Sequence, residues 1–154
     1  MKQRTLILLK PDCIQRRLAG TILSRFEQKG FTIVAMKMLQ VTKELAAQHY
    51  AEHVEKPFYP KLEEYITSDP IIAMILEGRD VITTVRKMVG STDGIKADPG
   101  SIRGDYSTSG QRNLVHASDS EASAEREMAI FFKPEEIVPR KIDDQYLFLA
   151  DRER

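Results

Sequence analysis

The 154-residue chain has a single cysteine and no long apolar run. A lone Cys13 cannot form a disulfide within the chain, which fits a reducing compartment such as the cytoplasm. No stretch approaches the ~18 apolar residues of a membrane-spanning helix, and the apolar part of the N-terminal segment is too short for a secretion signal. We therefore expect a cytoplasmic protein that has no membrane partner.

The sequence also lacks an excess of charge of either sign, because 23 Lys and Arg side chains balance 23 Asp and Glu side chains. A protein that coats nucleic acid or an anionic membrane normally carries a basic excess. Tryptophan is absent, and no strand pattern interleaves aromatic with basic residues as an RNA-binding sheet would. We expect no nucleic-acid partner, although a zero net charge does not exclude the binding of small polyanionic ligands.

Repeats, linkers and low-complexity segments are missing too, while hydrophobic residues make up 42% of the chain. That fraction, beside 30% charged residues, is typical of a globular protein and too apolar for a disordered one. A chain of 154 residues matches one domain and can bury roughly two-thirds of its unfolded surface. We expect residues 1–154 to form a single domain.

Apolar periodicity predicts an alternation of strands and helices. The expected strands cover residues 5–9, 31–39, 71–76 and 114–115. The expected helices cover residues 18–26 (closed by Gly30), 42–54, 59–67, 81–88 (capped by Asp80) and 118–131, the last opened by a capping box at Ser118 and Glu121. With residues 42–67 as an inserted helical pair, this order predicts an α+β fold, a ferredoxin-like βαββαβ sandwich. In that fold, helices would cover one face of an antiparallel four-stranded sheet.

Residues 91–112 show neither a helical nor a strand period and contain four glycines and one proline. We therefore expect a long loop before the last strand. Loops longer than about 12–15 residues inside compact domains are usually either functional or disordered.

His116 lies two residues before the helix start expected at Ser118. A helix N-terminus favours an anion and disfavours an imidazolium, because its N–H groups are unpaired and its dipole end is positive. From an unperturbed pKa of about 6.5, the side chain would be mostly neutral at pH 7, with one nitrogen free as a nucleophile. Glu127 could orient the other nitrogen if the chain folds back. The alternative is a structural histidine bonded to the helix cap.

His49 and His53 stand four residues apart in an expected helix, the spacing found in zinc metalloproteases. That motif, HExxH, needs a glutamate directly after the first histidine, whereas the glutamate here is Glu52. No third ligand is evident. The pattern therefore favours solvated or partly packed helix residues over a metal site.

The basic residues Lys10, Arg86, Arg103 and Arg112 recur at the expected turns and loop edges. Arginine suits phosphate because its guanidinium donates two parallel hydrogen bonds. No GxxxxGK[ST] motif is present, so any phosphate site would not be a P-loop. Phe58, at a helix entrance, is either a stacking platform for a base or a core residue.

Taken together, the motifs resemble those of the nucleoside diphosphate kinase family, over nearly the whole chain from about Arg4 to Phe148. They are LLKPD (residues 8–12), RFEQKGF (25–31), PGSIRGD (99–105), NLVHASD (113–119) and SAERE (123–127). One such segment would be weak evidence, but several in the same order and spacing are specific.

The resemblance implies transfer of the terminal phosphate from a nucleoside triphosphate, typically ATP, to a nucleoside diphosphate, which maintains nucleoside triphosphate pools. In this family the reaction is ping-pong, passes through a phosphohistidine and uses Mg²⁺-bound nucleotides. The partners would be these nucleotides and further copies of the chain. Homohexamers are the commoner assembly in the family, and tetramers also occur.

Carried over by position, His116 would be the nucleophile, oriented by Glu127 and Ser118. Asp119 would approach Mg²⁺ through water. The implied nucleotide contacts are Lys10 on the transferring phosphate and the ribose, Tyr50 at the phosphate site, Arg86, Thr92 and Arg103 on the phosphates, Asn113 on the ribose, Phe58 stacked on the base, and Leu62 beside it. A rival hypothesis, a binding module without the reaction, would have no need of the nucleophile.

Three departures from the family pattern stand out. Cys13 and Ala117 replace glycines, so we expect local backbone adjustment, with strain if either residue has a positive φ. Residues 109–111 (Ser-Gly-Gln) replace the apolar side chain that usually covers the second face of the base, so we expect the base to be held on one side only. Residues 91–94 lack the Asn-Pro that usually follows Thr92, in a loop used at subunit contacts.

Overall fold

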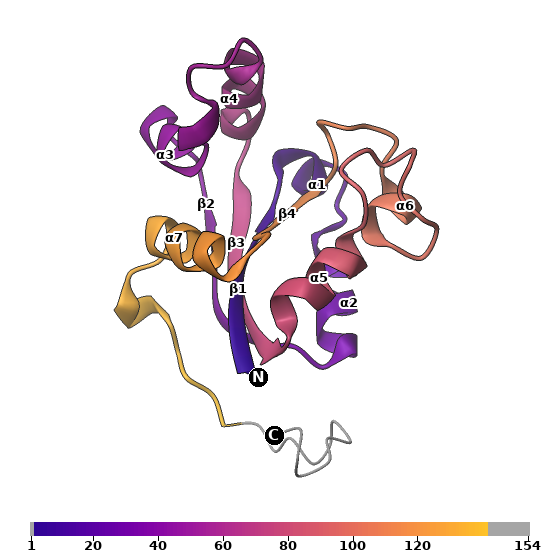
Figure 1. Ribbon diagram of the computed structural model, residues 1–154, viewed down its shortest axis with the longest axis vertical. Coiled ribbons are helices and arrows are strands. Elements are labelled where there is room, and N and C mark those ends of the chain that lie inside the picture. Colours follow the sequence, from indigo (N-terminus) through magenta and orange to yellow (C-terminus); the bar gives the residue numbers. More distant parts are fainter. Residues whose placement is uncertain (1, 142–154) are drawn as a thin grey trace.

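Four strands form one antiparallel sheet in the order β2-β3-β1-β4. The structure, a computed structural model, describes residues 2–141 (Figure 1). Met1 and residues 142–154 lie outside the described part. The single domain expected over residues 1–154 and the family resemblance that runs to Phe148 both extend into these residues. The strands are β1 (Lys2–Leu9), β2 (Thr32–Leu39), β3 (Ile71–Arg79) and β4 (Val115–Ala117). The α+β, ferredoxin-like expectation is confirmed.

Helices and short helical turns connect and cover the strands. They are α1 (Pro11–Gln15), α2 (Ala19–Lys29), α3 (Lys43–His49), α4 (Tyr59–Thr67), α5 (Val81–Val89), α6 (Ile102–Tyr106) and α7 (Glu121–Phe131), with 3-10 turns η1 (Ala51–His53) and η2 (Pro134–Glu136). Within residues 2–141, no helix combines the length and the hydrophobicity needed to cross a bilayer.

Helices cover both faces of the sheet, whereas one covered face was expected. In Figure 1, α2 and α5 lie on one side of the strands and α3 and α7 on the other. Successive residues of β1 point to opposite faces, and both sets are buried: Ile7 and Leu9 pack in the core on one face, Leu6 and Leu8 in the core on the other. The uninterrupted apolar run of β1 has this physical cause, since a strand buried on both faces does not alternate.

Two expected segments differ from the observed ones. The helix expected over residues 42–54 ends at His49 and continues only as the turn η1. The loop expected over residues 91–112 contains α6, capped by the Ser101 side chain, which accepts a hydrogen bond from the Gly104 N–H. Glycine is needed at position 104, because a Cβ there would lie 1.9 Å from the Asp98 carbonyl oxygen. Close packing of this kind, rather than any sequence period, orders the loop.

The cap expected from Asp80 is not formed by its side chain. Asp80 precedes α5 with φ 48°, and its side chain makes no cap hydrogen bond. Its carboxylate instead lies 3.6 Å from the guanidinium of Arg79.

Candidate active site

His116 is held by two neighbouring elements. On β4 it pairs with Leu8 of β1, so its backbone is fixed by the antiparallel ladder. Its ring Nε2 donates to Glu127 of α7, 2.9 Å from both carboxylate oxygens. Because a carboxylate only accepts, Nε2 carries the hydrogen, and Nδ1 is left with the lone pair. No residue within 2–141 makes a hydrogen bond with Nδ1, and His116 is 22% exposed. This nitrogen is therefore available as a nucleophile.

Ser118 supports the same carboxylate instead of capping the helix. Its hydroxyl donates to Glu127 Oε2 at 3.0 Å, and its side chain is fully buried. The residue that caps α7 is Ser120, whose Oγ accepts from the Ser123 N–H at 3.1 Å. The capping box expected at Ser118 is thus wrong by two residues, because the chain stays in register with β1 as far as Ser118, whose N–H donates to Leu6. The structural alternative for His116, a bond to the helix cap, is also not observed.

Lys10 and Asn113 form a buried pair at the end of β1. Lys10 Nζ donates to Asn113 Oδ1 at 2.7 Å, and the Asn113 amide donates to the carbonyls of Thr92 and Gly110. Burial, together with the positive charge of Arg103, lowers the pKa of Lys10 to about 8. One amide thus joins the end of the first strand to two points of the long loop.

Arg103 of α6 is buried against the backbone at the end of α5 and on either side of Leu114. Its guanidinium donates to the carbonyl oxygens of Gly90 (3.2 Å), Asn113 (3.2 Å) and Val115 (2.6 Å). Burial and the charge of Arg86 lower its pKa to about 10, so it stays cationic at neutral pH. Arg103 therefore brings a fixed positive charge to the loop and anchors the loop to the sheet.

A strained residue links these groups. Leu114 is buried and has φ 73°, a region that a leucine rarely adopts. Its N–H donates to Asp12 Oδ2 at 3.1 Å, its carbonyl accepts from the Lys10 N–H at 2.8 Å, and the other Asp12 oxygen accepts from the Tyr65 hydroxyl. Strain of about 1–3 kcal/mol persists only where the surroundings hold it, as these hydrogen bonds do here.

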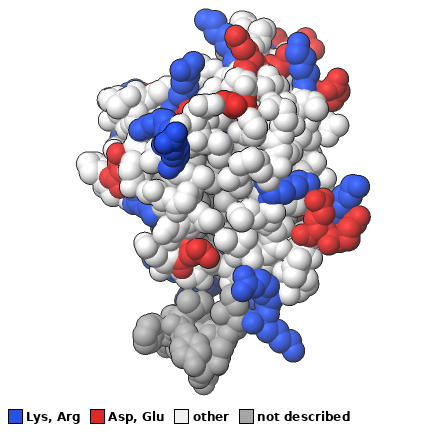
Figure 2. All heavy atoms as spheres, turned by 180° about the vertical axis from the view of Figure 1, so that it is seen from behind, with Lys and Arg blue, Asp and Glu red and all other residues white. Residues whose placement is uncertain are grey.

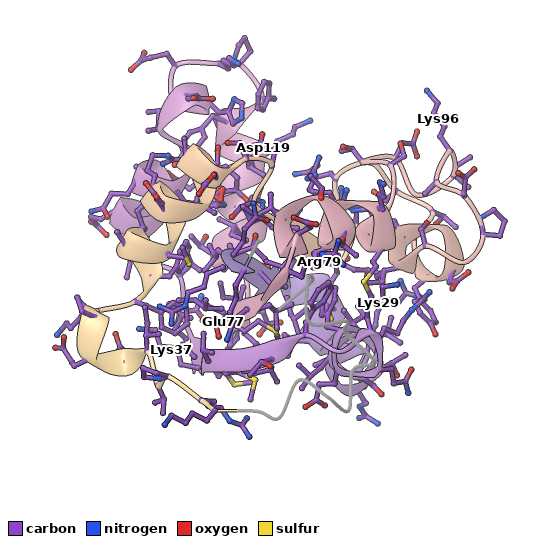
Figure 3. All side chains as sticks on the ribbon, turned by 60° about the horizontal axis from the view of Figure 1, so that its bottom comes forward. Lys29, Lys37, Glu77, Arg79, Lys96 and Asp119 are labelled. Atoms are coloured by element: carbon purple, nitrogen blue, oxygen red, sulfur yellow. The ribbon has the colours of Figure 1, made fainter. Side chains whose placement is uncertain are left out.

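His116 opens into a cavity of about 240 Å³. Tyr50, Arg86, Asp119 and Glu127 line it as well. Asp119 lies just ahead of α7 (Figure 3), and hydrogen bonds, chiefly from Ser123, lower the pKa of its carboxyl group. Burial raises the pKa of the Tyr50 hydroxyl, which stays protonated.

Several other predicted site residues do not line the cavity at His116. Lys10, Thr92, Arg103 and Asn113 are joined to one another through the bonds above, next to β4 and outside the cavity lining. Arg112 lines a different cavity, of about 520 Å³, together with Arg16 and Tyr65.

Phe58 precedes α4 with its side chain exposed, so it is not a core residue. Its ring centroid lies 5.4 Å from that of His53. Leu62, one turn further on, is half-buried. Gln111 reaches the same helix, because its side-chain amide donates to the Lys61 carbonyl at 3.3 Å. The departure at residues 109–111 therefore lies against the helix that begins after Phe58.

His49 is the residue that the sequence analysis missed. It was expected to be solvated or partly packed, but it is only 5% exposed, with its ring centroid 4.7 Å from that of His116. His53, the other histidine of that pattern, is half-buried and also lines the cavity. The available signal was helical spacing, because His49 follows the buried Ala46 by three residues on the inner face of α3.

The two residues that replace family glycines cause no left-handed backbone. Among residues 2–141, positive φ angles outside glycine occur only at Arg17, Asp80 and Leu114. Cys13 is buried in α1, and Ala117 is buried in β4, where its carbonyl accepts from Arg86 at 3.2 Å. Neither position is strained.

The charges of the surface shown in Figure 2 are mixed, with Lys and Arg scattered among Asp and Glu around a largely uncharged centre. That face has no continuous basic area of the kind that binds a nucleic-acid backbone. In Figure 3, Lys96 points outward from the long loop, away from Asp119. Lys10 and Arg103, by contrast, are buried beside β4.

Comparison with known proteins gives one consistent result. The family model described as Nucleoside diphosphate kinase matches residues 3–137. The nucleoside diphosphate kinase of Rhodopirellula baltica is 67% identical over 134 residues, which is 87% of this chain and 88% of the relative. That of Methanobrevibacter smithii is 52% identical over 96% of this chain and 98% of the relative.

A solved structure agrees with these relatives. The halophilic nucleoside diphosphate kinase from Halobacterium salinarum, in complex with CDP, superposes with a TM-score of 0.94 at 43% identity, covering 97% of this chain and 100% of that one. The chain therefore belongs to the nucleoside diphosphate kinase family, the enzymes that transfer the terminal phosphate of a nucleoside triphosphate to a nucleoside diphosphate.

Proposed function

We propose that His116 Nδ1 is the atom that carries the phosphate between the two nucleotides. The carrying observation is the pair of 2.9 Å contacts from Nε2 to Glu127, which leave Nδ1 as the ring nitrogen with a free lone pair. Ser118 donates to the same carboxylate and holds it in place. A nucleophile fixed on a strand and oriented by a buried carboxylate meets the main demand of phosphoryl transfer, which is positioning.

The reaction proceeds in two matching halves. In the first, the Nδ1 lone pair forms a bond to the terminal phosphorus of the triphosphate, and the bond from that phosphorus to its bridging oxygen breaks. The diphosphate leaves with the oxygen and its electron pair. In the second half, the terminal oxygen of a different diphosphate attacks the phosphohistidine, and Nδ1 recovers its lone pair. Glu127 stabilises the positive charge that the ring carries while Nδ1 is bonded to phosphorus.

The cations beside β4 are proposed to hold the phosphates, with Lys10 on the transferring group and Arg86 and Arg103 on the equatorial oxygens. Their positive charge neutralises the negative charge on the phosphate oxygens in the loose transition state. Tyr50 and Thr92 are proposed to complete the phosphate site. Asn113 Oδ1 uses one lone pair for Lys10, so its second lone pair is proposed to accept from a ribose hydroxyl.

The donors near His116 fit a nucleotide-bound Mg²⁺. Asp119 lines the cavity with its carboxyl pKa lowered, so an ionised oxygen donor of the kind Mg²⁺ prefers is present. We propose that Asp119 holds the ion through water. When bound, Mg²⁺ withdraws charge from the phosphate oxygens.

The base is proposed to stack on the exposed Phe58 ring, with Leu62 beside it. Stacking tolerates every base, because each has a π-face, so we infer that the enzyme accepts purine and pyrimidine nucleotides alike. Residues 109–111 supply no apolar cover for the other face. ATP is the proposed usual donor, and maintenance of nucleoside triphosphate pools is the proposed role.

The function is tested by labelling the protein with γ-labelled ATP and Mg²⁺. We expect acid-labile, base-stable label on the chain, as a phosphohistidine gives, and we expect added GDP to remove it as labelled GTP. Guanosine added in place of GDP is the control, since it has no terminal phosphate to accept the labelled phosphate group. Folded protein that takes up no label would contradict the proposal.

Self-association is proposed from the edge of the sheet. β2 is an edge strand whose Met36 and Met38 are 52% and 61% exposed, an apolar pair where a second copy could pack. We propose a homohexamer of single-domain chains, with a tetramer as the other form. Gel filtration with light scattering is expected to give six times the 17.6 kDa chain mass. A monomer mass at micromolar concentration would contradict self-association.

We also propose that the enzyme is cytoplasmic, since a lone cysteine cannot form a disulfide within the chain. Cys13 is buried, and burial raises the pKa of its thiol to about 12. The thiol therefore stays protonated and is a poor nucleophile.

A further inference from the structure

His49 is buried beside the nucleophile with no hydrogen-bond partner. Neither ring nitrogen bonds to any residue in the described part of the chain, although both are fully enclosed. Aromatic rings surround it, with centroids 4.5 Å away at Tyr50, 4.7 Å at His116 and 5.3 Å at Phe131. An unsatisfied buried nitrogen costs about 1–3 kcal/mol, so a fold that keeps one calls for an explanation.

The neutral ring of His49 has one nitrogen with an unshared lone pair. Burial, together with the charge of His116 when protonated and of Arg126, lowers its pKa to about 2. The groups that face it are His116 on β4, Glu127 and Arg126 on α7, Lys10 after β1, and Tyr50 and His53 on its own segment. A metal ion is a common partner of a neutral imidazole nitrogen and would satisfy the enclosed lone pair.

Two further donor groups lie within reach. One ligand atom from each of His49, His116 and Glu127 lies within 4.8 Å of the other two. All three residues line the cavity of about 240 Å³. A tetrahedral ion bonded at about 2.0–2.2 Å needs its ligand atoms roughly 3.4 Å apart. A shift of the side chains by about 1 Å would bring the three ligand atoms to this spacing. Three protein ligands with a fourth position open to a cavity is a common zinc arrangement.

We propose that His49, His116 and Glu127 form an inhibitory site for a borderline divalent cation, of which Zn²⁺ is the type. Two imidazoles and one carboxylate suit Zn²⁺ and its first-row neighbours, whereas Mg²⁺ prefers oxygen ligands in octahedral geometry. The site is therefore chemically distinct from that of the nucleotide-bound Mg²⁺ at Asp119.

Occupancy acts through the tautomer of His116. The metal takes the Nε2 position, so the hydrogen that Nε2 shared with Glu127 leaves to solvent and a proton adds at Nδ1. The ring stays neutral and no net proton is released, but the Nδ1 lone pair is now an N–H. That nitrogen cannot attack phosphorus until the metal leaves. This effect on catalysis rests on the proposed role of Nδ1, whereas the binding of the metal does not.

Binding is tested on nucleotide-free full-length protein, in a non-coordinating buffer with millimolar Mg²⁺ as competitor. Zn²⁺ titration by calorimetry is expected to show one ion per chain, and Co²⁺ is expected to give the visible absorption of a tetrahedral site. His49→Phe keeps a ring and removes both nitrogens, so we expect at least tenfold weaker binding. His53→Phe is the matched control four residues on, with a change below about twofold.

Unchanged Zn²⁺ affinity in a folded His49→Phe protein would overturn the site, and absence of binding by wild type would leave His49 as a packing residue only. If His49→Phe does not fold, Glu127→Gln serves as the second variant. It keeps a side chain that can bond with Ser118 but removes the ligand charge, and it should also weaken binding at least tenfold; an unchanged affinity would contradict the proposal.

Inhibition is tested separately with γ-labelled ATP. One equivalent of Zn²⁺ per chain is expected to lower labelling of wild type more than tenfold, and a zinc-selective chelator should restore it. Each variant is compared with its own metal-free rate, and His49→Phe should be insensitive. Binding without inhibition would contradict the tautomer step. If metal-free protein takes no label, the proposed nucleophile fails, while the Co²⁺ spectrum still decides the metal site.

Discussion

Replacement of His116 by alanine is expected to lower phosphate transfer by on the order of 10⁴-fold or more and to abolish labelling by γ-labelled ATP. The variant lacks the nitrogen that is proposed to bond to the phosphate, and within residues 2–141 only Ser118 also hydrogen-bonds the Glu127 carboxylate. The hydroxyl of Ser118 cannot substitute, because it is buried and already donates to the carboxylate.

The fold should survive this change. His116→Ala leaves the backbone pairing of Leu8 and residue 116 intact, and Ser118 still donates to Glu127. A cooperative thermal transition and near-wild-type nucleotide binding are the measurements that separate lost chemistry from lost structure. His53→Ala is the matched control, since it removes another histidine near the same cavity and should retain label. Full labelling of His116→Ala would mean that a different residue is the nucleophile.

Lys10→Met is expected to lower kcat/KM by about 10²–10³-fold, because methionine fills similar space without the charge that is proposed to hold the transferring phosphate. The melting temperature should hold or rise, since burial of the ammonium disfavours the folded protein, as its lowered pKa shows. Loss of activity without loss of stability is the expected signature. A variant with wild-type kcat/KM would remove Lys10 from the phosphate site.

The same residue gives the free enzyme a pH dependence with a defined sign. The pKa of Lys10 is lowered to about 8, so the ammonium is present below that pH and is lost as the pH rises through it. We expect wild-type kcat/KM to fall by about tenfold between pH 7 and pH 9, because this parameter reports groups of the free enzyme. Lys10→Met should lack that limb, and a limb that persists in the variant would belong to another group.

Local patterns were sufficient for the strands and for most helices. The apolar runs of β1 and β3 and the spacing in α5 are written within a few consecutive residues, so single-sequence reasoning could find them. The helix start at Ser120 was not accessible in this way. Ser118 and Ser120 both precede residues able to complete a cap, and only the pairing with β1, distant in sequence, turns Ser118 toward Glu127.

The site residues also divide into those that local sequence patterns predict and those that depend on packing between distant segments. The motif that contains His116 pointed to Glu127, eleven residues on along a strand-and-helix unit. The spacing of His49 from the buried Ala46 indicates the inner face of α3, but the packing of α3 against α7, distant in sequence, decides how deeply that face is enclosed. For Arg103 the sequence suggested phosphate contacts, and the structure adds three bonds to backbone carbonyls, which come from segments up to thirteen residues away.

The bonds around Leu114 have a consequence for how the molecule opens. A three-residue edge strand would by itself exchange its amide hydrogens quickly, through local fraying. Here, Asp12 holds the Leu114 N–H, Lys10 donates its own N–H to the Leu114 carbonyl, and Arg103 holds the carbonyls on both sides. β4 can therefore open only when the end of β1, α6 and the long loop open with it. We therefore expect the amides around the proposed nucleophile to exchange together with those of the end of β1 and of α6, and its orientation to last as long as this unit stays closed.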